Sequence, residues 1–167
     1  MLIFFDTEFT DLHVEARLIS IGLIAEDGRE FYAELSDTYQ PHQCGDFSRE
    51  FVLPLLDGGV ARMPMHELTL RLGNWLEGFE QSVQLATDSL AWDWPWIQRI
   101  FETSGTWPEN LAGQPLILLF DADVGEAFVN AVEAAFLTGL RQHHALDDAR
   151  ANRLGWIAAG GNTDHTP

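Results

Sequence analysis

The chain has 167 residues, 46% of them hydrophobic and 11% aromatic, which fits one globular domain with a sizeable core and excludes an intrinsically disordered chain. Its formal net charge is −17, with nine arginines and no lysine, so it lacks the basic stripe of a protein that coats long nucleic acid. No apolar stretch is long enough to span a membrane, the N-terminus does not resemble a signal peptide, and one cysteine, Cys44, suits a reducing compartment, so we expect a soluble cytoplasmic protein.

The first part of the chain predicts three strands. The opening stretch Leu2–Thr10 begins with an apolar run rich in aromatic and β-forming residues, which is typical of a buried strand. Arg17–Ala25 is equally rich in β-branched and aliphatic residues, and Glu30–Leu35 follows it after the hairpin dipeptide Asp27-Gly28. Short turns between these strands indicate an antiparallel meander.

The middle of the chain predicts a long excursion, then a helix and a strand. Residues 36–63 carry prolines and glycines between apolar residues, and we expect a loop with a short helix around Ser48–Leu56. Pro64–Phe79 has leucines at helical spacing and is expected to pack on the core. Val83–Thr87 is expected to form a fourth strand.

The last part of the chain predicts one more strand among helices. Pro95 fits the first turn of a helix that runs to about Thr103. Asp123 begins a capping-box pattern, which favours structural roles for Asp121 and Asp123. The remaining elements are a strand over Pro115–Phe120, a helix over Val124–Leu137 ended by Gly139, a link over Arg141–His144 and a last helix over Ala145–Ala159.

These elements together predict an α/β fold with a single domain over residues 1–159 and a loose tail over 160–167. A strand–helix–strand unit requires parallel strands, because the chain crosses over between them. We therefore expect a mixed five-stranded sheet, an antiparallel meander plus parallel strands, with helices on both faces.

Asp6 and Glu8 at the end of the opening strand are candidate metal ligands. Alternate residues of a strand point to the same face, so the two carboxylates would project together. Like charges this close repel each other unless a cation lies between them, and hard oxygen ligands favour Mg²⁺ or Mn²⁺. The alternative interpretation is a solvated turn that caps the next element.

Further candidates lie at two predicted helix starts. Asp93 follows the fourth strand, where the alternative role is an N-cap. His143 in the link and Asp148 in the first turn of the last helix could face one cleft together. The alternative treats His143 and His144 as solvated and Asp147 and Asp148 as charges favoured near a helix N-terminus.

Three motifs taken together resemble those of the DEDD superfamily of 3′-to-5′ exonucleases, in its DEDDh branch with a catalytic histidine. Asp6-Thr7-Glu8 resembles the first motif, Asp-x-Glu. The segment 88–93 (DSLAWD) resembles the second, with Asp88 where the family often has asparagine, and 143–148 (HHALDD) resembles the third, His-x4-Asp. The opening FFDTEF and residues 19–33 look most like the RNase AS type, small bacterial exoribonucleases that act on adenylate-rich RNA.

The resemblance implies a ribonuclease-H-like fold and a two-metal hydrolase. Asp6, Glu8, Asp93 and Asp148 would hold two divalent ions, Mg²⁺ or Mn²⁺, and His143 would be the general base. The enzyme would bind the 3′ end of single-stranded RNA, short or A-rich, release nucleoside 5′-monophosphates and form a homodimer.

Substrate contacts are expected beside the acidic residues. Phe9, Thr10 and Trp92 could stack on terminal bases, although the tryptophan could equally be a packing residue. Asp88 would contact substrate through its motif position, and Arg141 could bind phosphate. The alternative functions are a proofreading-type DNA exonuclease and a non-catalytic nucleic-acid-binding module on the same scaffold.

Overall fold

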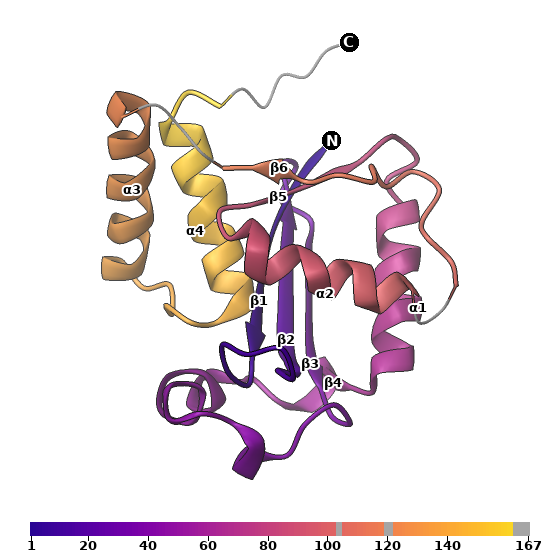
Figure 1. Ribbon diagram of the computed structural model, residues 1–167. Helices are drawn as coiled ribbons and strands as arrows, with labels where there is room; N and C mark the ends of the chain where they lie inside the picture. The colour runs from indigo at the N-terminus through magenta and orange to yellow at the C-terminus, as the bar shows by residue number, and fades with distance from the viewer. Residues whose placement is uncertain (103–104, 119–121, 162–167) are drawn as a thin grey trace.

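The computed structural model describes residues 1–102, 105–118 and 122–161, with backbone only at 122 and 123. Six strands form one mixed sheet in the order β4-β3-β2-β1-β5-β6 (Figure 1). The strands are β1 (Leu2–Phe9), β2 (Leu18–Ala25), β3 (Glu30–Leu35), β4 (Arg62–Met63), β5 (Gln84–Thr87) and β6 (Leu116–Ile117). The α-helices are α1 (Met65–Glu77), α2 (Leu90–Glu102), α3 (Ala122–Leu137) and α4 (Ala145–Ala158).

The expected antiparallel meander is confirmed. β1 pairs antiparallel with β2, and β2 pairs antiparallel with β3. Gly28 adopts φ 91° in the hairpin between β2 and β3, a backbone conformation that glycine tolerates. On the other side of β1 the pairing becomes parallel, first to β5 and then from β5 to β6. The carboxyl ends of β1 and β5 therefore lie at the same edge of the sheet, where α/β folds commonly place their sites.

The expected count of five strands was wrong, because a sixth strand lies at the end of the 36–63 excursion. β4 has two residues and pairs parallel with β3, placing Met63 opposite Leu35. Two residues carry no alternation that could reveal a strand in the sequence. The short helix expected in this excursion is present as consecutive helical turns over Ser48–Val52 and Leu53–Leu55.

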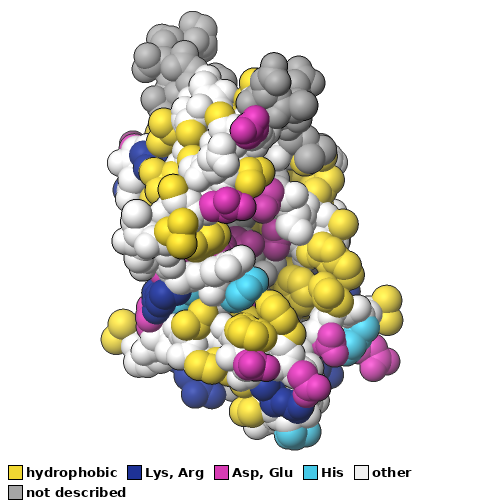
Figure 2. Space-filling model, turned by 90° about the vertical axis from the view of Figure 1, so that its left-hand side faces the viewer, with side chains coloured by type: hydrophobic (Ala, Val, Ile, Leu, Met, Phe, Trp, Pro, Cys, Tyr) yellow, Lys and Arg dark blue, Asp and Glu magenta, His cyan; other side chains and the backbone are white. Residues whose placement is uncertain are grey.

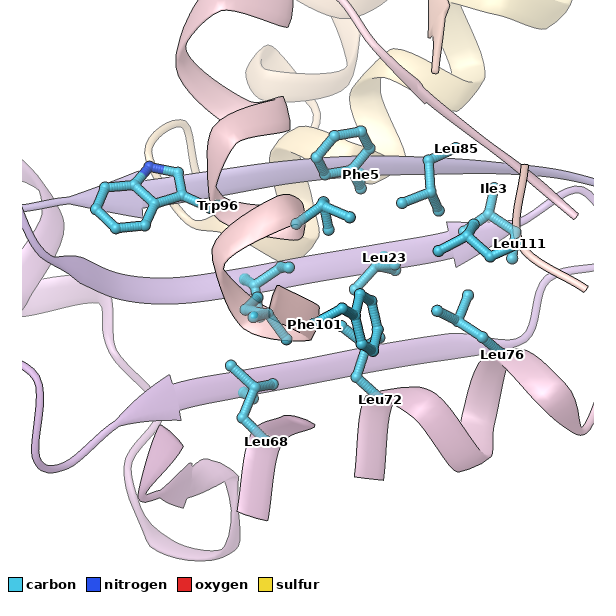
Figure 3. Packing of buried hydrophobic residues seen from close by; sticks show 14 of the residues in the cluster. Ile3, Phe5, Leu23, Leu68, Leu72, Leu76, Leu85, Trp96, Phe101 and Leu111 are labelled. Carbon is cyan, nitrogen blue, oxygen red and sulfur yellow. The ribbon is translucent and has the colours of Figure 1, made fainter. Parts of the chain in front are cut away.

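Alternate residues of β1 enter two separate cores. Ile3 and Phe5 are fully buried on the face covered by α1 and α2, where they meet the leucines of α1 (Figure 3). Leu2 and Phe4 are buried on the opposite face, which α3 and α4 cover. Helices thus cover both faces of the sheet, as expected (Figure 1).

Two helices begin earlier than expected. α2 begins at Leu90, five residues before Pro95, because the carbonyl of Ser89 accepts the N–H groups of Trp92 and Asp93 and forms the first turn. α3 begins at Ala122, whereas the capping pattern predicted Val124.

The predicted roles of Asp121 and the Asp123 side chain, the strand end at Phe120 and most of the tail lie outside the described residues. Within the described ranges, none of the helices has the length and apolar character needed to cross a membrane.

Candidate active site

A cleft of about 460 Å³ opens at the carboxyl end of β1, between the starts of α2 and α4. Figure 2 shows its acidic side chains gathered in a hollow, with a histidine at the edge and hydrophobic side chains around it. The acidic residues and histidine that line it are Asp6, Glu8, Asp88, Asp93, His143 and Asp148. Four elements or turns distant in the sequence therefore supply one site.

The ligand atoms of these residues form two groups. Oxygens of Asp6, Asp88 and Asp93 lie within 4.8 Å of one another. A second group with the same limit joins Glu8 and Asp148 to a ring nitrogen of His143. Each group has the size of a set of ligands around one cation, and each contains a residue of β1.

Asp93 is held by two threonines and is not an N-cap. Its side chain is 1% exposed, and its carboxylate accepts hydrogen bonds from Thr7 Oγ1 at 2.6 Å and Thr87 Oγ1 at 2.5 Å. Thr7 lies between Asp6 and Glu8 and points to the opposite face of β1, which explains how it reaches α2. The sequence argument missed both threonines, although strand alternation could have identified Thr7.

Burial and mutual repulsion disfavour the charged forms of the acids in this cleft. The pKa of Asp6 is raised by its burial and by the neighbouring Asp93 and Glu8. Burial and the charge of Asp148 raise the pKa of Glu8 to about 9, and burial raises the pKa of Asp148 to about 7. Among the described residues no arginine lines the cleft. Bound divalent cations would supply the missing positive charge, so the donor set fits them.

His143 faces the cleft from a strained turn. Its φ is 69°, a conformation that a residue with a side chain rarely adopts, and its backbone N–H donates to Asp148 Oδ2 at 2.9 Å. The ring lies edge-on to Phe47, with centroids 4.8 Å apart. Burial lowers the pKa of His143, which favours the neutral imidazole that can accept a proton.

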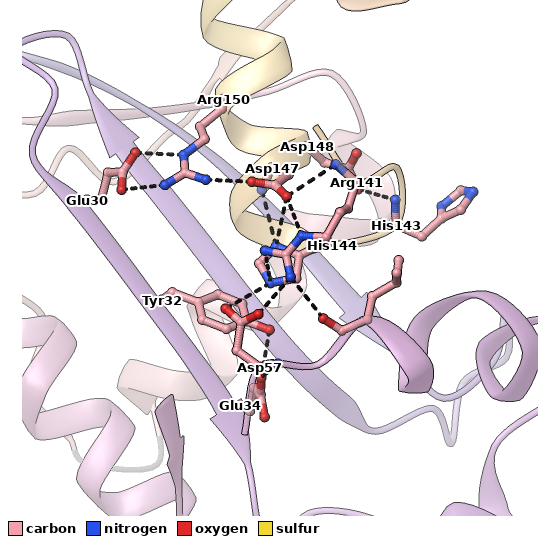
Figure 4. A network of polar contacts seen from close by, with 11 residues as sticks. Glu30, Tyr32, Glu34, Asp57, Arg141, His143, His144, Asp147, Asp148 and Arg150 are labelled. Atoms are coloured by element: carbon pink, nitrogen blue, oxygen red, sulfur yellow. Dashed lines mark hydrogen bonds and ion pairs between the residues drawn. The ribbon is translucent and has the colours of Figure 1, made fainter. Parts of the chain in front are cut away.

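The adjacent His144 and Asp147 lie in a separate polar network (Figure 4). His144 is buried, stacks on Tyr32 at 4.5 Å and accepts the Asp147 N–H at the start of α4. Asp147 forms ion pairs with Arg141 and Arg150. Of the two adjacent histidines and two adjacent aspartates of the third motif, His143 and Asp148 therefore line the cleft, and His144 and Asp147 support the structure around it (Figure 4).

Two of the residues predicted to contact substrate are not brought to this cleft. The Arg141 guanidinium binds Asp147 and Asp57, each at 2.7 Å, and donates to the Leu55 carbonyl. Thr10 is buried, and its hydroxyl accepts the Arg17 N–H.

The other three predicted contacts do line the cleft. Phe9 stacks on Trp92, with ring centroids 6.0 Å apart, and Trp92 is 45% exposed. Asp88 accepts a hydrogen bond from Asn152 Nδ2 at 2.9 Å. Asn152 was missed by the sequence argument, although its position one turn after Asp148 on α4 could have identified it.

Comparisons with known proteins place the chain beside exonucleases. No protein-family model matches it. It is 36% identical over 98 residues to curated proteins named 3′-5′ exoribonuclease from two strains of Mycobacterium tuberculosis, H37Rv and CDC 1551. The match covers 58% of this chain and 54% of each relative, so the chain spans about half the length of the curated relatives it matches.

Two solved structures share the fold. The nuclease domain of 3′hExo, a DEDDh family member bound to rAMP, has a TM-score of 0.58 and 15% identity over 95% of this chain and 90% of that chain. Escherichia coli ExoI, in a zinc-bound complex with single-stranded DNA, has a TM-score of 0.54 and 14% identity over 93% of this chain and 40% of that chain. The expected ribonuclease-H-like α/β fold is thereby confirmed.

Proposed function

We propose that this protein is a metal-dependent 3′-5′ exonuclease that hydrolyses single-stranded RNA. One observation carries the proposal: Asp6, Glu8, Asp93 and Asp148 meet in one cleft, and no arginine of the described residues offsets their charge there. The curated relatives named 3′-5′ exoribonuclease support the reaction type and the preference for RNA.

The four acids would hold two divalent ions, Mg²⁺ or Mn²⁺, with Asp88 beside the group that contains Asp6 and Asp93. Such ions, when bound, polarise the phosphate, lower the pKa of the attacking water and stabilise the leaving oxygen. The threonine hydroxyls that donate to Asp93 would keep its carboxylate oriented.

His143 would act as the general base. Its ring nitrogen lies within reach of Glu8 and Asp148, and burial favours its neutral form. It would take a proton from the water that attacks the terminal phosphodiester, and the products would be a nucleoside 5′-monophosphate and a chain one nucleotide shorter.

Phe9 and Trp92 would stack on the unpaired terminal bases, because aromatic faces bind single strands without a need for base pairing. We propose short or A-rich RNA as the preferred substrate. The structural neighbour bound to rAMP supports an adenylate fit, and the charge of −17 disfavours long polyanions.

The test is a time course on 5′-labelled oligonucleotides, with matched RNA and DNA of several lengths and base compositions in Mg²⁺, Mn²⁺ or EDTA. We expect a ladder that shortens from the 3′ end of RNA, and no products in EDTA. Preferred hydrolysis of DNA would favour the proofreading-type alternative. Oligonucleotide binding with no products in either metal would favour the non-catalytic binding module.

We also propose that the protein acts as a homodimer, as in the family it resembles. Light scattering coupled to size-exclusion chromatography would test this, with a mass near 18.8 kDa contradicting it.

A further inference from the structure

A second hollow of about 350 Å³ is lined in part by α2, the helix that also lines the candidate active-site cleft. It is bounded by the turn between β1 and β2, the chain after β3, the start of α1 and one face of α2. Arg17 comes from the turn, Trp96 and Arg99 come from α2, and Asp37 completes the wall. Figure 1 shows α2 running from beside α4 toward α1, and residues of α2 line both hollows, Trp92 the cleft and Arg99 the second hollow.

A chain of ring contacts leads from the cleft to this hollow. Phe9 lines the cleft and stacks on both Trp92 and Trp96, with ring centroids 6.0 and 6.1 Å apart. The Arg99 guanidinium lies over the Trp96 ring at 4.8 Å from its centroid. Residues 92, 96 and 99 follow the spacing of one helix face, so they form a continuous track along α2.

The hollow also collects positive charge in a strongly acidic protein. Within the described residues, acidic side chains form ion pairs with Arg29, Arg49, Arg71, Arg141 and Arg150. In the described part of the chain Arg17 forms no ion pair. Its guanidinium nitrogen Nη1 donates one long hydrogen bond of 3.4 Å to the Thr38 carbonyl. The Asp37 carboxylate in the same wall accepts the Met65 N–H at the start of α1.

The opposite border of the cleft differs in charge. There the exposed rings of Phe47 and Phe51 flank His143, and the nearby Arg49 is paired with Asp46. An RNA strand that leaves the cleft would find aromatic surface on both borders. Along α2 that surface continues to a hollow with two arginines.

We propose that Arg17 and Arg99 bind the backbone phosphates of the nucleotides that lie 5′ to the terminal ones, as the strand crosses Phe9 and Trp92 and reaches Arg99 over the buried Trp96 ring. This assignment rests on the proposed function for the direction in which the strand leaves the cleft. Guanidinium groups suit the role because their planar fork binds phosphate through two donors, and stacking on Trp96 holds one of them in place.

The test compares substrates of two to eight nucleotides in Arg17→Ala, Arg99→Ala and the double variant. We expect kcat/KM for the octanucleotide to fall about tenfold for each lost arginine, which corresponds to about 1.4 kcal/mol for each lost phosphate contact. The dinucleotide, which ends before the second hollow, should be cleaved at the wild-type rate. The slope of the logarithm of octanucleotide affinity against the logarithm of salt concentration should also become shallower by about one for each arginine removed.

Arg71→Ala is the matched control, because it removes the same charge from an exposed ion pair with Glu67 on α1. Its kcat/KM for both substrates should equal that of the wild type. Arg99 is exposed, so Arg99→Glu provides a second variant if the Arg17 variant fails to fold.

Binding measured by fluorescence anisotropy in EDTA separates this inference from the proposed function. If the wild type cleaves nothing but the double variant binds the octanucleotide more weakly than the wild type does, the proposed function is contradicted and the binding track is supported. Cleavage by the double variant with a wild-type ratio of octanucleotide to dinucleotide rates would overturn the track and leave the function in place.

Discussion

Gly22 of β2 lies directly against Leu146 of α4. A Cβ atom built at Gly22 would fall 2.2 Å from the Leu146 backbone nitrogen. Because the clashing atom belongs to the backbone, a change of side-chain rotamer could not relieve the clash. Gly22 also pairs with Asp6 across β1 and β2. The missing side chain therefore lets the start of α4 rest on the sheet beside Asp6, and Asp148 lies only two residues farther along the helix.

Gly22→Ala should destabilise the protein and reduce activity together. The new methyl group meets backbone atoms of Ala145 and Leu146 at the start of α4, so we expect a loss of about 3 kcal/mol or more in the free energy of unfolding, measured in urea. Gly73→Ala is the control. Gly73 lies in the middle of α1, and its added Cβ would lie at an ordinary contact distance of 3.8 Å from the Phe101 ring. Alanine favours the helix more than glycine does, so this variant should be more stable than the wild type by about 0.5–1 kcal/mol. Equal stability of the two variants would contradict the close approach of α4.

Replacing the two adjacent histidines should give opposite results. His143→Ala should lower kcat by about 10²–10⁴-fold, as expected for loss of a general base, and leave thermal stability near that of the wild type. His144→Ala should cost about 0.5–2 kcal/mol of stability, because it removes the acceptor at the start of α4 and the stack on Tyr32. Similar kinetic and stability losses in both variants would contradict the division of roles.

The metal-free protein should lose stability as the pH rises. The pKa of Glu8 is raised from 4.5 to about 9 and that of Asp148 from 3.8 to about 7, so the folded state holds protons that the unfolded state releases. The stabilisation is complete below the ordinary pKa values and is lost as the pH rises through the raised ones. We expect the Tm in EDTA to fall between pH 5 and pH 9.

Metal should reverse this trend, because Mn²⁺ binds the deprotonated carboxylates and competes with protons. The increase in Tm on adding Mn²⁺ should therefore be larger at pH 8 than at pH 5. Glu8→Gln, which cannot ionise, should show a flatter Tm profile in EDTA and a smaller response to Mn²⁺. A wild-type Tm that is independent of pH in EDTA would contradict the electrostatic account of the cleft.

Thr7→Val should weaken metal use without removing a ligand. Valine keeps the volume but cannot donate to Asp93, so one orienting hydrogen bond of 2.6 Å is lost. We expect the Mn²⁺ concentration for half-maximal activity to rise about 10-fold or more. Thr69→Val is a suitable control, because its hydroxyl donates to carbonyls of α1 and α2 away from the cleft. An unchanged metal requirement in the first variant would show that Thr7 does not orient Asp93.

The sequence predicted the elements that carry strong local signals. The strands β1 and β2 are continuous runs of β-forming apolar residues, and α1 has leucines at helical spacing, and the structure confirms all three. β4 escaped prediction because a two-residue strand has no pattern of its own, and only pairing with β3 defines it. The start of α2 was misplaced because Pro95 was taken as a first-turn marker, whereas the helix tolerates it one turn later.

The acidic motifs of the candidate site could be predicted because their residue types are restricted by chemistry. The residues that hold these acids in place could not be predicted, because each of them acts through a contact between segments that are distant in the sequence. Asn152 reaches Asp88 only because α4 packs on β1 and β2, next to the turn that follows β5, and Arg141 binds Asp57, which lies 84 residues away in the sequence. Arg141 shows the limit most clearly, because an arginine next to a motif suggests phosphate binding until its partners are known.

Calorimetric titration of Mn²⁺ into the wild type, Asp6→Asn and Asp148→Asn tests most directly whether residues from opposite ends of the chain form one metal site. We expect the wild type to bind Mn²⁺ and each substitution to weaken that binding about 10-fold or more, with loss of RNA hydrolysis in both variants. Wild-type Mn²⁺ affinity in both variants would contradict the account.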